Sequence, residues 1–181
     1  MWTFERMKRA LLILAGLLLL FSAFLVWYKA TYSMDVVSER SSGPEDAAQR
    51  VLVATQGSTY KDLVTDHVIG HLTDQSIAVQ VVDVTMLGSV DASPFDAVVI
   101  LHTWESWEPQ TDAQAFLNAH PDRTRFVVLA TSGGGDEMIE GVDGISSASV
   151  VDEAQADADS LIARLDRVLA RGRAPVSPSS R

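Results

Sequence analysis

One short segment combines hydroxyl side chains with a glycine in a pattern that suits ligand binding. It comprises Thr55-Gln56-Gly57-Ser58-Thr59, and we call it the Thr55 segment. Before a helix, these hydroxyl groups and the exposed backbone N–H groups would form a cradle for a phosphate group. The segment lacks the G-x-G-x-x-G of a dinucleotide site and the G-K-[ST] of a nucleotide P-loop. It is also typical of a tight turn followed by a Ser/Thr helix cap, so both interpretations stay open.

Two further segments offer an aromatic surface and an accessible backbone. Two tryptophans within four residues are hard to bury and suit stacking on a planar ligand, or else one packs under its loop while the other contacts a partner or a membrane surface. A run of glycines lets a ligand approach the backbone closely, or forms a mobile loop. The Trp104 segment comprises Thr103, Trp104, Glu105 and Trp107, and the Gly133 segment comprises Ser132, Gly133, Gly134 and Gly135.

Each segment follows a short apolar run, and such runs are typical of strands buried on both faces of a parallel sheet. Amphipathic stretches at 59–73, 111–119 and 152–171 predict helices, the last with Asp152 as its N-cap. Residues 85–94 are rich in Gly, Pro and Ser, so they are expected to be mostly loop with a single turn. The apolar runs span residues 51–55, 77–84, 96–101, 125–131 and, less strongly, 144–150.

Strands that alternate with helices predict an α/β fold of three layers, with a doubly wound, five-stranded parallel sheet between helices. In such folds ligands bind at the carboxyl ends of the strands, where the strand order reverses. The three segments would therefore meet at one edge of the sheet. This domain is expected to span residues 50–171.

An uncharged run of nineteen residues, 10–28, precedes the domain. Its length is close to the roughly 20 residues with which a helix crosses a bilayer core. It ends in bulky side chains, including Trp27 and Tyr28, rather than in the small-x-small site of a cleaved signal. We therefore predict one transmembrane helix over residues 10–28, in contact with the lipid bilayer.

Charge is distributed unequally along the chain. Residues 1–29 hold four basic and one acidic residue, whereas the remainder holds ten basic and 23 acidic residues. Arg6, Lys8 and Arg9 precede the apolar run, so the positive-inside rule predicts a cytoplasmic N-terminus over residues 1–9. The acidic domain would then lie outside the cell (inner) membrane, in a periplasmic or extracellular position.

The composition excludes several classes of function. A domain with such an excess of acidic residues repels phosphate backbones, so we expect no nucleic-acid binding. The chain has no cysteine, which excludes disulfides, thiol catalysis and thiolate metal sites. Residues 29–49 and 172–181 are rich in Ser, Pro and Gly with little periodicity, so we predict a linker and a disordered tail, respectively.

The residues also carry a family resemblance. The run 54–59 (ATQGST), followed by 61–64 (KDLV), is similar to the A-T-x-x-G-S-T stretch of flavodoxin-like quinone-linked oxidoreductases, with one residue missing. The run 100–104 (ILHTW) resembles the loop after the third strand of flavodoxins. The sequence thus resembles the flavodoxin family over roughly residues 50–170, which implies the strand order 2-1-3-4-5. Ala54 and Gln56 depart from the usual phosphate loop [ST]-x-T-G-x-T.

Because flavodoxins bind FMN non-covalently, the resemblance implies an FMN site. The Thr55 segment would hold the phosphate, the Trp104 segment would face the isoalloxazine ring, and the amides of the Gly133 segment would meet its polar edge. Acidic residues near the ring would lower the flavin potential and could recognise a basic redox partner. These acidic residues are Glu105, Glu108, Asp136 and Glu137.

Two functions follow as expectations. The first is a membrane-anchored, FMN-binding protein that transfers electrons or acts in quinone-linked redox chemistry, with a partner protein or a quinone. The second is a cofactor-free, degenerate flavodoxin-fold interaction module outside the membrane. In the first function the flavin does the chemistry while the protein supplies position and electrostatics.

A few residues suit other chemistry. Residues 143–149 (DGISSAS) are similar to the D-G-x-[ST]-G-A-[ST] motif of covalent FMN attachment, with Ser149 as the acceptor, or else they belong to a fifth strand. His67 and His71 have a helical i, i+4 spacing but lack the Glu of H-E-x-x-H, which favours surface histidines over a metal site. His102 would touch a flavin or cap a strand, and His120, before Pro121, is predicted to stop a helix.

Overall fold

The computed structural model describes residues 4–32, 34–105 and 107–173. The chain divides into two compact units, Met1–Met34 and Asp35–Arg181. The first unit contains a single described element, the helix α1 (Phe4–Tyr32), which is longer than the predicted 10–28. Between Arg6 and Trp27, α1 is long and apolar enough to span a membrane. Its large apolar side chains are exposed along this length, which suits a helix that packs against lipid.

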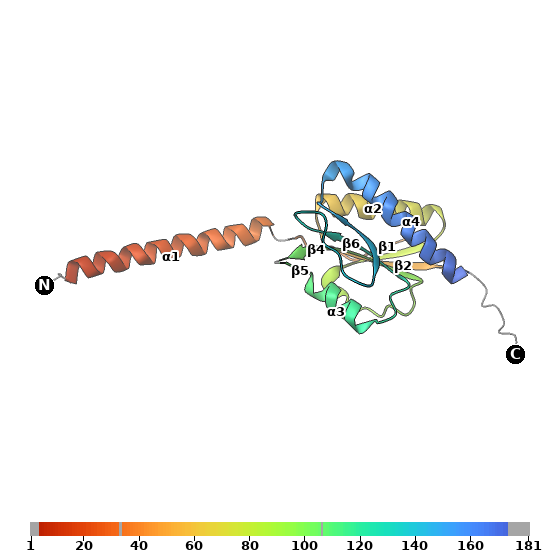
Figure 1. The fold of residues 1–181 in the computed structure, drawn as a ribbon, viewed down its shortest axis with the longest axis horizontal. Coiled ribbons are helices and arrows are strands. Elements are labelled where there is room, and N and C mark those ends of the chain that lie inside the picture. Colours follow the sequence, from red (N-terminus) through yellow and green to blue (C-terminus); the bar gives the residue numbers. More distant parts are fainter. Residues whose placement is uncertain (1–3, 33, 106, 174–181) are drawn as a thin grey trace. The chain divides into compact units, whose positions relative to one another are not determined.

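The second unit is built on a mostly parallel sheet with helices on both faces (Figure 1). Five of its strands run parallel to their neighbours, in the spatial order β3-β2-β4-β6-β7. The prediction of an α/β fold with a largely parallel sheet is confirmed. These strands are β2 (Arg50–Thr55), β3 (Ala78–Asp83), β4 (Ala97–Glu105), β6 (Phe126–Thr131) and β7 (Asp143–Ser147).

The sheet has seven strands rather than the predicted five. The two additional strands are short and antiparallel: β1 (Arg40–Ser42) pairs with β3, and β5 (Glu108–Pro109) pairs with the end of β4. Neither contains the alternation of apolar and polar residues that marks a strand in a sequence. Strand β4 also continues to Glu105, four residues past the predicted end, because its last residues pair with β5.

The prediction of a linker over residues 29–49 is wrong for residues 35–42. Asp35 forms an antiparallel bridge with Gly57. The N–H of Val37 donates to Asp83 Oδ2 at 2.8 Å, and Gln80 Nε2 donates to Glu39 Oε1 at 2.7 Å. Without this segment β3 would be an open edge with unpaired backbone groups, so covering it satisfies those groups and blocks association through the edge.

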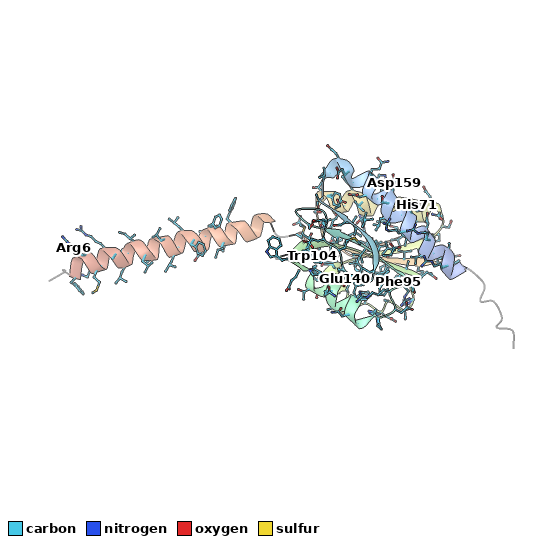
Figure 2. The ribbon with its side chains drawn as sticks, in the orientation of Figure 1. Arg6, His71, Phe95, Trp104, Glu140 and Asp159 are labelled. Atoms are coloured by element: carbon cyan, nitrogen blue, oxygen red, sulfur yellow. The ribbon has the colours of Figure 1, made fainter. Side chains whose placement is uncertain are left out.

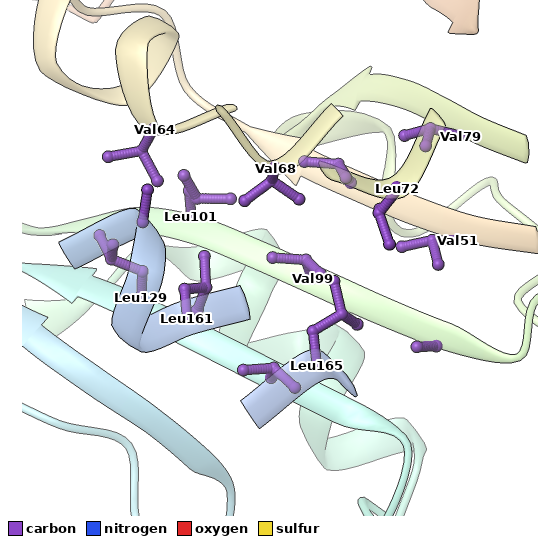
Figure 3. Close-up of a cluster of buried hydrophobic side chains, with 14 of the residues drawn as sticks. Val51, Val64, Val68, Leu72, Val79, Val99, Leu101, Leu129, Leu161 and Leu165 are labelled. Atoms are coloured by element: carbon purple, nitrogen blue, oxygen red, sulfur yellow. The ribbon is translucent and has the colours of Figure 1, made fainter. Parts of the chain in front are cut away.

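The helices bury the two faces of the sheet. Helices α2 (Thr59–Asp74) and α4 (Ala154–Arg173) lie on one face, and α3 (Thr111–Ala119) lies on the other (Figure 1). Each fully buried aliphatic side chain contributes about 1.5–3 kcal/mol, so the larger cluster is a main source of stability. That cluster includes Val64, Val68 and Leu72 of α2, Leu161 and Leu165 of α4, and Val99 and Leu101 of β4 (Figure 3).

Most of the predicted helix boundaries are confirmed. Helix α3 has the predicted bounds, with His120 at its C-cap, and α2 ends one residue later than predicted. Asp152 is not an N-cap, because a 3₁₀ turn, η2 (Val151–Glu153), precedes α4. The segment after β3 is a loop with one turn, η1 (Val84–Met86), as predicted. Helix α4 extends to Arg173, and the rest of the predicted tail, 174–181, lies outside the described residues.

Candidate functional site

The segments that follow β2, β4 and β6 meet at one edge of the sheet, because these three strands are neighbours. Gln56 links two of the segments. Its Oε1 accepts the backbone N–H of Thr103 at 2.6 Å, and its Nε2 donates to Glu105 Oε1 at 3.1 Å. Gln56 is buried, so these bonds satisfy its amide where water has little access. This residue, predicted to bind a ligand, therefore joins the Thr55 and Trp104 segments.

Lys61 lies beneath this edge, and the sequence reasoning missed it as a site residue. The side chain is fully buried, and its Nζ donates to Thr103 Oγ1 at 2.7 Å. Burial lowers the pKa of Lys61 to about 8, although the nearby Glu105 carboxylate acts in the opposite direction. Lys61 is the one lysine after residue 29, and it lies between Tyr60 and Val64, which α2 buries. A lone lysine among apolar helix positions is the signal that could have identified it.

The Thr55 segment is closed by partners from within the chain. The N–H of Gly57 donates to the carbonyl of Asp35 at 2.8 Å, and the carbonyl of Gly57 accepts the N–H of Asp35 at 3.1 Å. The space beside Gly57 is filled as well, because a Cβ there would lie 2.7 Å from the Asp35 carbonyl oxygen. Ser58 Oγ accepts the N–H of Lys61 at 3.2 Å, as the N-cap of α2. The structure therefore has a tight turn with a serine cap.

These residues do not fit an FMN phosphate. The N–H of Gly57 is already bonded, and Thr55 is buried, with its Oγ1 donating to the carbonyl of Gln56 at 3.2 Å. The Thr55 segment borders a hollow of about 340 Å³ whose charged lining is mostly acidic. A phosphate there would meet carboxylates, which disfavour an anion. The charged residues of this hollow are Asp35, Glu39, Arg40, Asp62 and Asp66.

The Trp104 and Gly133 segments converge on a separate pocket of about 550 Å³. We call it the aromatic–acidic pocket. Thr103, Glu105 and Gly135 do not line it, and neither does any residue of the Thr55 segment. The structure thus brings two of the three predicted segments into one pocket and leaves the third outside. The pocket is lined by Trp104, Trp107, Ser132, Gly133, Gly134, Asp136 and Glu137.

The two tryptophans differ in their environment. Trp104, labelled in Figure 2, is half-buried and packs against the apolar cluster under α3. Its ring centroid lies 6.2 Å from that of His102. Trp107 is 90% exposed and lies in the turn between β4 and β5. Its φ of 71° is in the left-handed region, which a bulky side chain rarely adopts. One tryptophan therefore anchors the pocket, and the other is presented to the surroundings.

Internal hydrogen bonds fix the rim of the pocket. Ser132 Oγ accepts the N–H of Gly135 at 3.0 Å, and the N–H of Ser132 donates to the carbonyl of Ser147 at 3.1 Å. Ser146 Oγ donates to the carbonyl of Glu137 at 2.9 Å. The Gly133 segment is therefore tied to β7, and the backbone that carries Asp136 and Glu137 is held in place.

His102 lies inside β4 rather than at its end, and it is fully buried. Burial lowers the pKa of His102 to about 4, so the imidazole is neutral near pH 7. Its Nδ1 lies 3.3 Å from the carbonyl oxygen of Thr103, while its Nε2 has no hydrogen-bond partner among the described residues. The imidazole is absent from the lining of the aromatic–acidic pocket and lies behind Trp104.

The remaining candidate residues lie elsewhere. Strand β7 ends at Ser147, so the predicted fifth strand is shorter than 144–150. Ser149 follows it with a φ of 60°, and covalent attachment there stays a prediction. His67 is exposed, and His71 Nε2 lies 3.0 Å from Asp166 Oδ1 on α4. Among the described residues no cluster of three His, Asp or Glu side chains is arranged to hold a metal ion.

No protein-family model matches the chain, and no curated protein matches its sequence.

Proposed function

We propose that this protein is a membrane-anchored interaction module of flavodoxin-like fold that does not use FMN. The observation that carries this proposal is the bridge between Asp35 and Gly57. The bridge occupies the N–H of Gly57, one of the backbone donors of the predicted phosphate cradle, and residues 35–42 that form it also pair with β3 through β1. The aromatic–acidic pocket, at the same edge of the sheet, is suited to a protein partner.

The strand order supports the flavodoxin-like part of the proposal. Counted without the two antiparallel strands, the five parallel strands lie in the order second, first, third, fourth, fifth. The order reverses between β2 and β4, which is where ligands of such folds bind. The fold alone does not define a function, which depends on the residues at this edge.

The charge distribution supports a domain held outside the membrane. Arg6, Lys8 and Arg9 precede the apolar stretch of α1, and Lys29 is the one basic residue close after it. By the positive-inside rule the N-terminus stays in the cytoplasm and the unit Asp35–Arg181 lies outside. The test is a reporter that works only in the cytoplasm, fused after Arg181. Activity of this reporter would contradict the orientation.

A second candidate is the FMN-dependent electron carrier, or quinone-linked oxidoreductase, that the family resemblance implies. The aromatic–acidic pocket favours it, because its volume of about 550 Å³ and its two indole rings suit a planar group. Asp136 and Glu137 disfavour it, since they would repel an anionic reduced flavin. Flavin binding would then depend on ring contacts without a phosphate cradle.

Flavin retention distinguishes the two candidates. The full chain, purified in detergent, is mixed with excess FMN, desalted and examined by visible absorption and flavin fluorescence, beside a flavodoxin that retains FMN. The proposal predicts no retained flavin and no quenching at micromolar protein. Retained flavin that is lost in the variant Trp104→Ala would overturn the proposal in favour of the electron carrier.

A further inference from the structure

The aromatic–acidic pocket combines two features that a ligand could use. Its lining has two tryptophans and two carboxylates but no basic residue. Among the described residues, neither the carboxylate of Asp136 nor that of Glu137 forms an ion pair or accepts a hydrogen bond. Glu137 is half-buried and Asp136 is exposed, so a ligand in the pocket can reach both carboxylates.

The backbone of the pocket holds these carboxylates in place. A Cβ at Gly134 would lie 2.7 Å from Asp136 Oδ1, so the absence of a side chain lets this carboxylate fold over the glycine. The carbonyl of Glu137 is bonded to Ser146 on the neighbouring strand β7. The backbone that carries both acidic residues is therefore fixed beside the pocket.

Trp107 supplies an independent observation. Its ring is 90% exposed, and its backbone has a left-handed φ of 71°. Such a conformation costs on the order of 1 kcal/mol or more for a bulky residue, and strain of this kind is concentrated at functional sites. Exposed tryptophans near a well-formed pocket are typical of the residues that dominate protein–protein interfaces.

Charge decides between the occupants that such a pocket could take. A phosphate or an anionic lipid would be repelled by the two carboxylates. A neutral apolar segment would cover Glu137 and leave its charge buried and unpaired, which is unfavourable. A guanidinium group satisfies both features, because its face stacks on indole rings while its N–H groups bond to carboxylates.

We propose that the aromatic–acidic pocket binds an arginine side chain in a basic segment of a partner protein. Trp104 and Trp107 would stack on the guanidinium, and Asp136 and Glu137 would accept its N–H groups. The overall excess of acidic residues after residue 29 would steer such a basic segment toward the domain. This inference rests on the proposed function, and it names the chemistry of the partner.

The test uses the full chain in nanodiscs of neutral phosphatidylcholine and the peptide acetyl-Gly-Arg-Arg-Gly-amide. Binding is measured by calorimetry, and a second peptide replaces both arginines with citrulline, which has the same shape without the charge. We expect saturable binding of the arginine peptide that weakens as salt is raised. The citrulline peptide should bind at least about tenfold more weakly, since it retains stacking but lacks the charge-assisted bonds.

Matched variants locate the binding. Glu137→Gln and Trp107→Ala should each weaken the arginine peptide by about tenfold or more. Glu140→Gln removes the same charge from an exposed residue of the same loop that does not line the pocket, so it should leave the affinity unchanged. Circular dichroism before each titration verifies that the variants are folded; because Trp107 is exposed, its replacement removes no core contact.

Several results would overturn the inference. They are an absence of saturable binding up to about 1 mM peptide, equal binding of the citrulline peptide, and equal binding by the Glu137→Gln and Trp107→Ala variants. Tighter binding of a neutral apolar tetrapeptide, or self-association of the chain that is lost in Trp107→Ala, would assign the pocket to another occupant. These results reject the arginine site alone as long as FMN is not retained. Retention of FMN would instead reject the proposed FMN-free interaction module.

Discussion

The Thr55 segment and the aromatic–acidic pocket lie at the same edge of one sheet, and both have the residue types of a binding site. They differ in how their polar groups are used. In the Thr55 segment, the amide of Gly57 and the hydroxyl of Ser58 have hydrogen-bond partners within the chain. In the pocket, two carboxylates and an exposed indole are left without such partners among the described residues. Residue types alone do not distinguish the two regions, whereas polar groups without hydrogen-bond partners in the chain are the ones available to a ligand.

The difference has a cause in the chain. The residues that close the Thr55 segment come from residues 35–42, which also cover the β3 edge. Lys61 links the same segment to Thr103, because its backbone N–H donates to Ser58 Oγ and its Nζ donates to Thr103 Oγ1. The pocket has no comparable covering segment in the described part of the chain, and its rim is fixed by β7 instead. One region is therefore organised for stability, whereas the other is organised for contact.

The largest expected effect comes from reversing the charge of Lys61. In Lys61→Glu, a carboxylate would be buried beside Glu105 and would lose the hydrogen bond to Thr103, so we expect a loss of about 3–5 kcal/mol in the free energy of unfolding. The measurement is chemical denaturation of the full chain in detergent. Asp62→Asn changes an exposed neighbour on the same helix and should have little effect. Equal stability of the two variants would mean that Lys61 does not hold this region together.

A pH dependence is expected from His102, on the strand that both regions share. Its pKa is lowered to about 4 in the folded protein, below the 6.5 of an unperturbed histidine. Between these values the unfolded chain binds more protons, so the stabilising contribution is complete above pH 6.5 and is lost progressively as the pH falls from 6.5 to 4. The loss should reach at most about 3.4 kcal/mol, at 1.36 kcal/mol for each pKa unit.

Denaturation at pH 7 and pH 4.5 tests this dependence. His102→Leu removes the titrating group and should reduce the difference in stability between the two pH values, because a neutral apolar side chain has no charged form to desolvate. His67→Gln removes an exposed histidine and should behave as the wild type does. If His102→Leu and the wild type lose the same stability on acidification, the buried imidazole is not the cause.

Gly57→Ala addresses the closure of the Thr55 segment directly. The added methyl would lie 2.7 Å from the Asp35 carbonyl oxygen, so residues 35–42 must shift, at a cost of about 1–3 kcal/mol. Hydrogen exchange should then accelerate at the amides of Asp35 and Val37, which are bonded in the wild type. Gly88→Ala has open space around the new methyl and serves as the control. Unchanged exchange in Gly57→Ala would show that the closure is loose.

The sequence predicted the layers of the fold because the buried strands are long apolar runs. Val51 to Ala54 and Val98 to Leu101 are fully buried on both faces, so the requirement for apolar residues leaves a clear pattern. The strands β1 and β5 escaped prediction because they form at an edge and in a hairpin, where backbone pairing requires no particular side chain. For the same reason residues 35–42 have the composition of a linker although they pair with the sheet.

The site could be predicted only in part. The Trp104 and Gly133 segments meet as expected, because parallel strands bring their carboxyl ends together. The closure of the Thr55 segment was not predictable, since it depends on Asp35, which lies twenty-two residues before Gly57. Lys61 was overlooked because a lysine on a helix is ordinarily exposed, whereas the packing of α2 buries this one.

The smallest expected effect separates the two tryptophans of the pocket. In Trp107→Gly, the left-handed backbone is relaxed because glycine has no Cβ, and almost no buried surface is lost. We expect stability to be unchanged or to increase by up to about 1 kcal/mol, although glycine also gains freedom in the unfolded chain. Trp104→Ala, by contrast, removes a half-buried ring from the cluster under α3 and should be destabilising by about 2–3 kcal/mol.

Both variants should weaken the arginine peptide, so affinity alone does not separate the two tryptophans, and stability does. Thermal unfolding of the two variants beside the wild type gives the comparison. A marked loss of stability in Trp107→Gly would mean that this ring supports the fold, and its exposure would then be no argument for a partner. Retained stability together with lost peptide binding would mean that the strained turn is kept for contact, because it contributes nothing that the fold itself requires.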